Sequence, residues 1–186
     1  PADNIILNEL KKDKENKLEQ LFLSAYYDKN YIDAIEYSKK LVELNPLNGN
    51  SYDNMGSTYF KQGKYQESIK SFEKAIEINS KNDGAYNNMG IAYGLLEEYE
   101  KAIESYQKAI EINPKNGVAY NNMGIAYGHL GEYEKGIDAY KKAIEKDSTI
   151  GIRYANLFEA NLINNSEFDN KIEAKFIAHF KEDKNA

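Results

Sequence analysis

The 186-residue chain has no cysteine and no tryptophan, and it has only three prolines and two histidines. Without cysteine it has no disulfide framework, no thiol nucleophile and no cysteine-ligated metal site. Its hydrophobic runs are short, as in Leu21-Phe22-Leu23, whereas a membrane-spanning helix needs about 20 apolar residues. We therefore expect no membrane insertion and no thiol chemistry.

Basic residues are also fewer than acidic ones. The chain has 24 Lys+Arg against 30 Asp+Glu, which gives a net charge of -6. Contact with phosphates requires a basic face, so this balance argues against a nucleic-acid partner. With 41% hydrophobic residues, the composition is that of a folded protein and not of a disordered tail.

The start of the chain shows no targeting signal. It opens Pro1-Ala2-Asp3-Asn4, which resembles neither a secretory signal nor a transit peptide. It also lacks an initiator methionine, as a trimmed chain or a piece of a longer protein would. The compartment is not assigned by these features, and the cytoplasm is favoured.

A repeat of 34 residues dominates the sequence. The string Tyr-x-Asn-Met-Gly begins at Tyr52, Tyr86 and Tyr120, and segments 83–116 and 117–150 are identical at 21 of 34 positions. A fixed period in this range is typical of proteins built from stacked supersecondary units.

Each repeat has the hydrophobic spacing of two short helices. In 83–116, Tyr86, Met89 and Tyr93 lie on one helical face, and a second stripe begins at Tyr99. The expected helix boundaries carry suitable residues. N-cap asparagines precede the first helices, and prolines follow two of the second helices; these residues are Asn48, Asn82, Asn116, Pro46 and Pro114.

These positions resemble the tetratricopeptide repeat family, whose pattern is an aromatic, Leu-Gly, Tyr, Ala, an aromatic, Ala and a late Pro. Segment 83–116 matches it with Tyr86, Met89-Gly90, Tyr93, Ala102, Tyr106, Ala109 and Pro114. The resemblance implies an all-α, right-handed superhelical solenoid of antiparallel helix pairs. We place strong repeats at 49–82, 83–116 and 117–150, and a degenerate one at 15–48.

Both ends depart from the pattern. Phe22 and Phe158 stand where the repeats have glycine, so we expect the end pairs to be looser or re-angled. Residues 151–186 read as a degenerate fifth repeat with a C-terminal capping helix, because Phe168, Ile172, Phe176 and Phe180 recur every four residues. Residues 1–14 are expected to form an extra helix or a mobile arm.

In this family the first helices line a concave surface, which implies a binding groove offset from the packing stripe. One column of side-chain amides recurs every 34 residues, and an amide can pair with both the N–H and the C=O of an extended peptide. The same column can instead bond neighbouring helices, and both readings stay open. The groove candidates are Gln20, Asn54, Asn88, Asn122 and Asn156 of that column, together with Asp53, Asn87, Asn121, Ile91, Ile125, Leu95, Lys61 and His129.

Signals for other chemistry are weak. His129 and His179 are too far apart in the sequence to suggest a metal site, and no phosphate-binding loop or catalytic pair is evident, so no cofactor is expected. Some family members bind a chaperone C-terminus through a Lys, Asn and Arg clamp. Asp53, Asn87 and Asn121 occupy the position of its first lysine, which argues against that ligand.

Three functions are compatible with the sequence. The leading one is a non-enzymatic scaffold that binds an extended or helical peptide segment of a protein partner in its groove. The second is a self-assembling protein that forms homo-oligomers through its groove, its repeat ends or the apolar segment Asn4–Leu10. The third is the recruitment domain of a larger enzyme.

Overall fold

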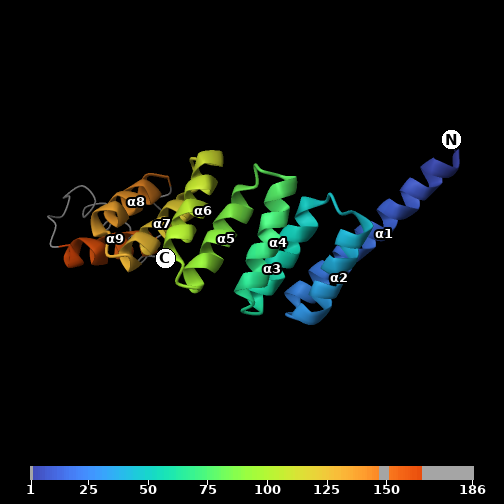
Figure 1. Ribbon diagram of the computed structural model, residues 1–186, viewed down its shortest axis with the longest axis horizontal. Helices are drawn as coiled ribbons and strands as arrows, with labels where there is room; N and C mark the ends of the chain where they lie inside the picture. Colours follow the sequence, from blue (N-terminus) through green and yellow to red (C-terminus); the bar gives the residue numbers. More distant parts are fainter. Residues whose placement is uncertain (1, 147–150, 165–186) are drawn as a thin grey trace, which may run out of the picture. The chain divides into compact units, whose positions relative to one another are not determined.

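The computed structural model describes residues 2–146 and 151–164, which form helices joined by short turns and contain no strand (Figure 1). They fall into two compact units, the first ending at Leu96 and the second beginning at Glu97. Unit 1 contains α1 (Ala2–Tyr27), α2 (Tyr31–Leu44), α3 (Gly49–Lys61), α4 (Tyr65–Ile78) and α5 (Asp83–Leu95). Unit 2 contains α6 (Tyr99–Ile112), α7 (Gly117–His129), α8 (Tyr133–Lys146) and α9 (Gly151–Ile163).

The helix boundaries follow the capping residues expected from the sequence. Asn48, Asn82 and Asn116 are the N-caps of α3, α5 and α7, and each side chain accepts a hydrogen bond from a backbone N–H of the first turn. Pro46 and Pro114 follow directly after the C-caps of α2 and α6. Because both ends of these short helices are defined locally, consecutive helices within each unit fold back on each other, as α3 does with α4 and α7 with α8.

In the pairs α3–α4 and α7–α8, a glycine on the first helix faces an aromatic ring on the second. A Cβ atom at Gly56 would lie 2.8 Å from two ring atoms of Phe72, and one at Gly124 would lie 2.6 Å from Tyr140. Phe72 and Tyr140 are both buried. The glycine therefore provides the space into which the ring of its partner helix packs.

The first pair reverses this arrangement. Phe22, which replaces the glycine, is only 3% exposed and packs with Ala34 and Leu41 of α2. The α2 residue at the position of Phe72 is Ser38, which is fully buried and donates a hydrogen bond to the Ala34 carbonyl. The large and small residues have exchanged helices, so the pair is well packed and the expected loosening around Phe22 is not what the structure shows.

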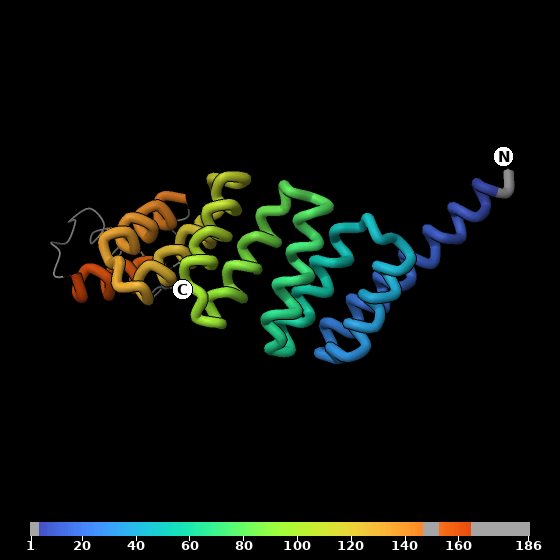
Figure 2. Tube along the Cα trace, viewed as in Figure 1, coloured from blue at the N-terminus to red at the C-terminus, as the bar shows by residue number. Residues whose placement is uncertain are grey.

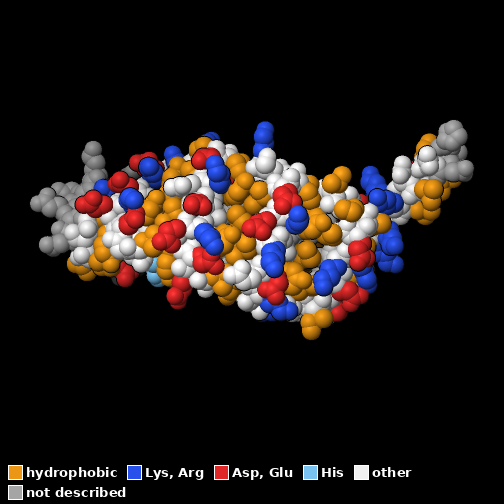
Figure 3. All heavy atoms as spheres, in the orientation of Figure 1, with side chains coloured by type: hydrophobic (Ala, Val, Ile, Leu, Met, Phe, Trp, Pro, Cys, Tyr) orange, Lys and Arg blue, Asp and Glu red, His pale blue; other side chains and the backbone are white. Residues whose placement is uncertain are grey.

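Residues 2–14 belong to α1 itself. They form neither a separate helix nor an arm, because α1 runs without interruption from Ala2 to Tyr27 and extends beyond α2 (Figure 2). This extension leaves Ile5, Ile6, Leu7 and Leu10 more than half exposed. Hydrophobic side chains are visible on its outer end in Figure 3.

In unit 2 the degenerate last repeat contributes α9 to the core. Tyr154 and Leu157 of α9 are almost fully buried and pack against Ile137, Tyr140 and Ile144 of α8. Arg153 is also buried and donates a hydrogen bond to the Ala143 carbonyl at 3.2 Å. The predicted capping helix with Phe168, Ile172, Phe176 and Phe180 lies outside the described residues.

Candidate functional site

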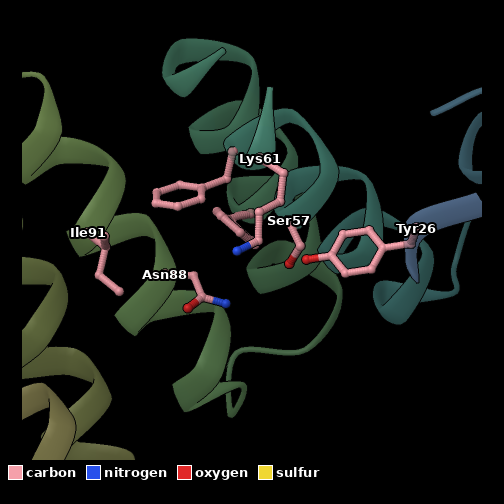
Figure 4. A pocket seen from close by; sticks show the side chains of 7 residues that line it. Tyr26, Ser57, Lys61, Asn88 and Ile91 are labelled. Atoms are coloured by element: carbon pink, nitrogen blue, oxygen red, sulfur yellow. The ribbon is translucent and has the colours of Figure 1, made fainter. Parts of the chain in front are cut away.

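Unit 1 contains a cavity of about 170 Å³ between two of its first helices. Ser57, Phe60 and Lys61 of α3 form one wall, and Asn88 and Ile91 of α5 form the other (Figure 4). The remaining lining residues are Phe72 of α4 and Tyr26 of α1. The cavity thus combines an aromatic and aliphatic lining with a few polar groups, as small binding sites commonly do.

The polar groups of the unit 1 cavity are the Lys61 ammonium, which only donates hydrogen bonds, and the side chains of Ser57, Tyr26 and Asn88, which both donate and accept. The Asn88 Oδ1 atom accepts a long hydrogen bond of 3.5 Å from the Asn87 Nδ2 atom. The Nδ2 donors of Asn88 take no part in that bond. Figure 4 shows the hydroxyls of Ser57 and Tyr26 pointing toward each other on the side of the cavity that the Asn88 amide nitrogen faces. Lys61 is exposed and adds a positive charge. These groups suit an acceptor such as a carbonyl or a carboxylate.

Unit 2 contains a wider cleft of about 370 Å³. Its walls are formed by α7 and α9, and two tyrosines of α8 complete it. The lining residues are Ile125, Gly128, His129, Tyr133, Tyr140, Asn156, Glu159, Ala160 and Ile163. No lysine or arginine is among them.

The two sites are equivalent in the repeat frame. Advancing by two 34-residue periods takes Lys61 to His129, Asn88 to Asn156, and Ile91 to Glu159. The same step takes Ser57 to Ile125 and Phe72 to Tyr140. Both sites therefore have an amide on one wall, Asn88 or Asn156, and an aromatic ring of the second helix, Phe72 or Tyr140. They differ in their charged residue.

The polar groups of the unit 2 cleft are differently arranged. The Asn156 Nδ2 atom donates a hydrogen bond of 3.1 Å to the Asn121 Oδ1 atom of the neighbouring first helix. The ring of His129 stacks on that of Tyr99, with centroids 4.5 Å apart and planes 4° from parallel. Burial, and secondly the negative charge of Glu159, raise the pKa of Tyr140 to about 12, so its hydroxyl stays protonated.

The structure places the other predicted groove residues as follows. Gln20 and Leu95 are exposed, whereas Asn54 and Asn122 are half-buried on α3 and α7. Asn87 and Asn121 serve as hydrogen-bond partners of the amide column, since they contact Asn88 and Asn156. Asn156 of the column bonds a neighbouring helix and also lines the cleft, and contact of the column with a ligand stays a prediction.

Asp53 differs from the equivalent asparagines of the later repeats in its hydrogen bonding. It occupies the position of Asn87 and Asn121, but its buried Oδ1 atom has no hydrogen-bond partner among the described residues. Burial raises the pKa of the Asp53 carboxyl above its ordinary value. Asp53 is therefore a locally unfavourable residue in the core-facing part of α3 and not an exposed contact.

Several lining residues were not expected from the sequence. Tyr26, Phe60 and Phe72 are not among the predicted groove residues, although a side chain that packs on one side can line a cavity on the other. Glu159 could have been found, because it continues the column of Ile91 and Ile125 by one further period into the degenerate last repeat.

Among the residues that the structure describes, no group of three or more His, Cys, Asp or Glu side chains is arranged to hold a metal ion. Within the same residues, no helix combines the length and the apolar character that crossing a bilayer demands.

Comparison with known proteins identifies the family. Two family models, both described as tetratricopeptide repeat, match residues 47–115 and 117–149. The chain belongs to the tetratricopeptide repeat family. Neither model indicates a catalytic family. A search of curated proteins found no match.

Solved structures with the same fold include a crystal structure of MamA, which is 24% identical with a TM-score of 0.79, over 89% of this chain and 95% of that one. MamA 41-end from Desulfovibrio magneticus RS-1 is 19% identical with a TM-score of 0.80, over 93% and 97%. The first repeat domain of Spaghetti, bound to the HSP90 peptide SRMEEVD, is 24% identical with a TM-score of 0.62, over 63% and 94%. The predicted all-α solenoid fold is confirmed.

Proposed function

We propose that this tetratricopeptide repeat protein is a non-enzymatic scaffold that binds an extended or helical peptide segment of a partner along its first helices. The observation that carries the proposal is the unit 1 cavity, where the predicted groove residues Lys61, Asn88 and Ile91 line one space. Repeats of this family support protein–protein interaction, and no catalytic family is indicated.

The cavity suits a peptide that brings an acceptor group to it. The Asn88 amide donates to a main-chain carbonyl, and the Lys61 ammonium pairs with a carboxylate of the peptide. Phe60, Phe72 and Ile91 provide apolar surface for a neighbouring side chain. Because these contacts are few, we expect recognition of a short segment with modest affinity and not of a whole folded surface.

The neighbour Spaghetti was solved with an HSP90 peptide, which supports peptide binding by this fold. The same ligand is not proposed for this chain. Asp53, Asn87 and Asn121 stand where the chaperone clamp has its first lysine, so none of the three supplies the positive charge that an acidic tail requires.

A displayed library of random linear peptides tests the proposal. We expect selected peptides to be rich in Asp and Glu, and Lys61→Ala and Asn88→Ala each to weaken their binding about five- to tenfold, as expected for loss of a hydrogen bond to a charged group. Lys70→Ala is the matched control, because Lys70 is exposed on α4 and does not line the cavity. Failure to select any peptide, or equal losses in all three variants, would contradict the proposal.

Self-assembly is a second candidate, favoured by the α1 extension. Ile5, Ile6, Leu7 and Leu10 are between 54% and 62% exposed on consecutive turns of one helix. Several exposed apolar residues close together commonly mark an interaction site. If it joins copies of the chain, light scattering will detect concentration-dependent oligomers that Ile6→Lys/Leu10→Lys abolishes and that Leu47→Lys, at an exposed loop position, preserves. A wild-type protein that is monomeric at every concentration rules this out.

A further inference from the structure

The two equivalent sites differ in the sign of their charge. The unit 1 cavity has Lys61 on its first wall and the uncharged Ile91 on its second. In the unit 2 cleft the corresponding residues are His129 and Glu159. The charged group has thus moved to the opposite wall and changed sign, while the amide and the aromatic ring between the helices are kept.

The Glu159 carboxylate is available for a ligand. It is exposed, lines the cleft, and forms no hydrogen bond or ion pair within the described part of the chain. Every salt bridge of that part joins other residues, from Lys40–Glu36 on α2 to Lys135–Glu132 at the start of α8. No cation of the described residues therefore compensates Glu159.

A second acceptor lies on the same wall. The Asn156 amide donates through its Nδ2 atom to Asn121, and this bond fixes the orientation of the amide. The Oδ1 atom of Asn156 takes no part in that bond and can accept a hydrogen bond from a ligand. Asn156 and Glu159 are three residues apart on α9 and both line the cleft, so they lie on one helical face. The cleft therefore offers a carboxylate and an amide oxygen as acceptors, whereas the charged group of the unit 1 cavity is the Lys61 ammonium, a donor.

From this arrangement we infer that the unit 2 cleft binds an arginine side chain of a partner peptide. The guanidinium donates to the Glu159 carboxylate and to the Asn156 Oδ1 atom, and its aliphatic stem packs between Ile125 and Ile163. Arginine fits better than lysine because its planar fork has five donors and stacks on aromatic rings, which Tyr133 and the His129 ring supply here.

The inference rests on the proposed function only in taking the first helices as the peptide-binding surface. It adds a ligand chemistry for unit 2 that the unit 1 cavity does not share. Charge complementarity is its argument, since the described residues that line the cleft include one carboxylate and no lysine or arginine.

Proton–nitrogen correlation NMR of the full chain tests it with three capped tripeptides that carry Arg, Gln or Glu between two alanines. We expect the Arg peptide to shift the backbone signals of Ile125, His129, Asn156 and Glu159 in a saturable manner. The Gln peptide is expected to bind about tenfold more weakly, and the Glu peptide to cause no shift there.

Two variants make the test specific. Glu159→Gln should weaken binding of the Arg peptide about tenfold, whereas Glu145→Gln, with the same charge change at an exposed position of α8 outside the cleft, should leave it unchanged. Glu159→Lys should abolish binding of the Arg peptide and allow the Glu peptide to bind. Equal binding by Glu159→Gln and Glu145→Gln, or shifts outside the cleft only, would overturn the inference.

Two other occupants would also overturn it. Cleft signals that respond to protein concentration and not to peptide would assign the cleft to a second copy of the chain. Nuclear Overhauser contacts from residues 165–186 to Ile125 or Ile163 would assign it to the chain's own C-terminal segment. Losses confined to Lys61→Ala and Asn88→Ala would refute this inference alone and leave the proposed function standing.

Discussion

Gly124 lies so close to Tyr140 that a Cβ atom on residue 124 would be 2.6 Å from the Cε1 atom of the tyrosine ring. The contact joins the first and second helices of one repeat. It explains the glycine in the Tyr-x-Asn-Met-Gly string, since any side chain at residue 124 would displace the ring or separate the helices.

Gly124→Ala is therefore expected to destabilise the protein. The added methyl group meets a ring that is itself buried, so we expect the free energy of unfolding to fall by about 1–3 kcal/mol. Chemical denaturation followed by circular dichroism measures the change.

Gly128→Ala on the same helix is the matched control. A Cβ atom there would meet nothing within 4 Å, and alanine favours the helix over glycine by about 0.5–1 kcal/mol. We expect this variant to be more stable than the wild type. Equal destabilisation by both variants would show that the ring contact is not the cause.

The exchanged pair Phe22 and Ser38 gives a second prediction. Phe22→Gly removes a buried ring and should lower the free energy of unfolding by about 3–5 kcal/mol. Adding Ser38→Phe restores the arrangement of the regular repeats and should recover much of that loss. A double variant no more stable than Phe22→Gly would mean that the backbone of the first pair has adapted to its own residues.

The N-cap asparagines give a third prediction. The Asn116 Oδ1 atom accepts a hydrogen bond of 3.0 Å from the Ala119 N–H at the start of α7. Asn116→Ala should cost about 1 kcal/mol of stability, whereas Asn116→Ser keeps an acceptor and should cost less. Thermal unfolding of the two variants distinguishes the loss of the cap from a general intolerance of residue 116 to change.

Asp53 gives a prediction that depends on pH. Its buried Oδ1 atom has no partner in the described residues, and the equivalent position in unit 2 is Asn121, which accepts a hydrogen bond from Asn156. Asp53→Asn removes a partly buried charge and should raise the free energy of unfolding at pH 7 by about 0.5–1.5 kcal/mol.

The sign of the pH effect follows from the raised pKa of Asp53. In the folded state this carboxyl binds its proton at a higher pH than in the unfolded state, where its pKa is near the ordinary value of 3.8. As the pH falls through the folded pKa toward that value, the folded state takes up more protons and is stabilised. The advantage of Asp53→Asn should therefore shrink on acidification, and an advantage that grows would contradict this account.

Much of the fold could be predicted from the sequence. The 34-residue period, the N-cap asparagines and the late prolines are local signals, so helix pairs and most of their boundaries were available without a structure. The structure of residues 2–14 was not predicted. The polar segment around Lys11 and Lys12 contains no helix terminator, and α1 continues through it.

The candidate site was predicted only in part. The amide column is a periodic feature, and Asn88 and Asn156 of that column line the two sites. Which of its members bonds a neighbouring helix depends on the separation of helices that are 34 residues apart, which no local pattern encodes. The same holds for Tyr26, which reaches the unit 1 cavity from the first helix of the preceding repeat.

The sequence by itself determined the repeat, its period, the helix pairs and the acidic, cysteine-free composition, because each depends on residue type and local spacing. Only the tertiary structure decided that Phe22 is buried in the core of the first pair and that the Asp53 Oδ1 atom is buried without a hydrogen-bond partner among the described residues. It also decided that Lys61 and Glu159 give equivalent sites opposite charges. These properties arise where helices from different repeats meet, and packing and desolvation there depend on side chains that the sequence keeps far apart.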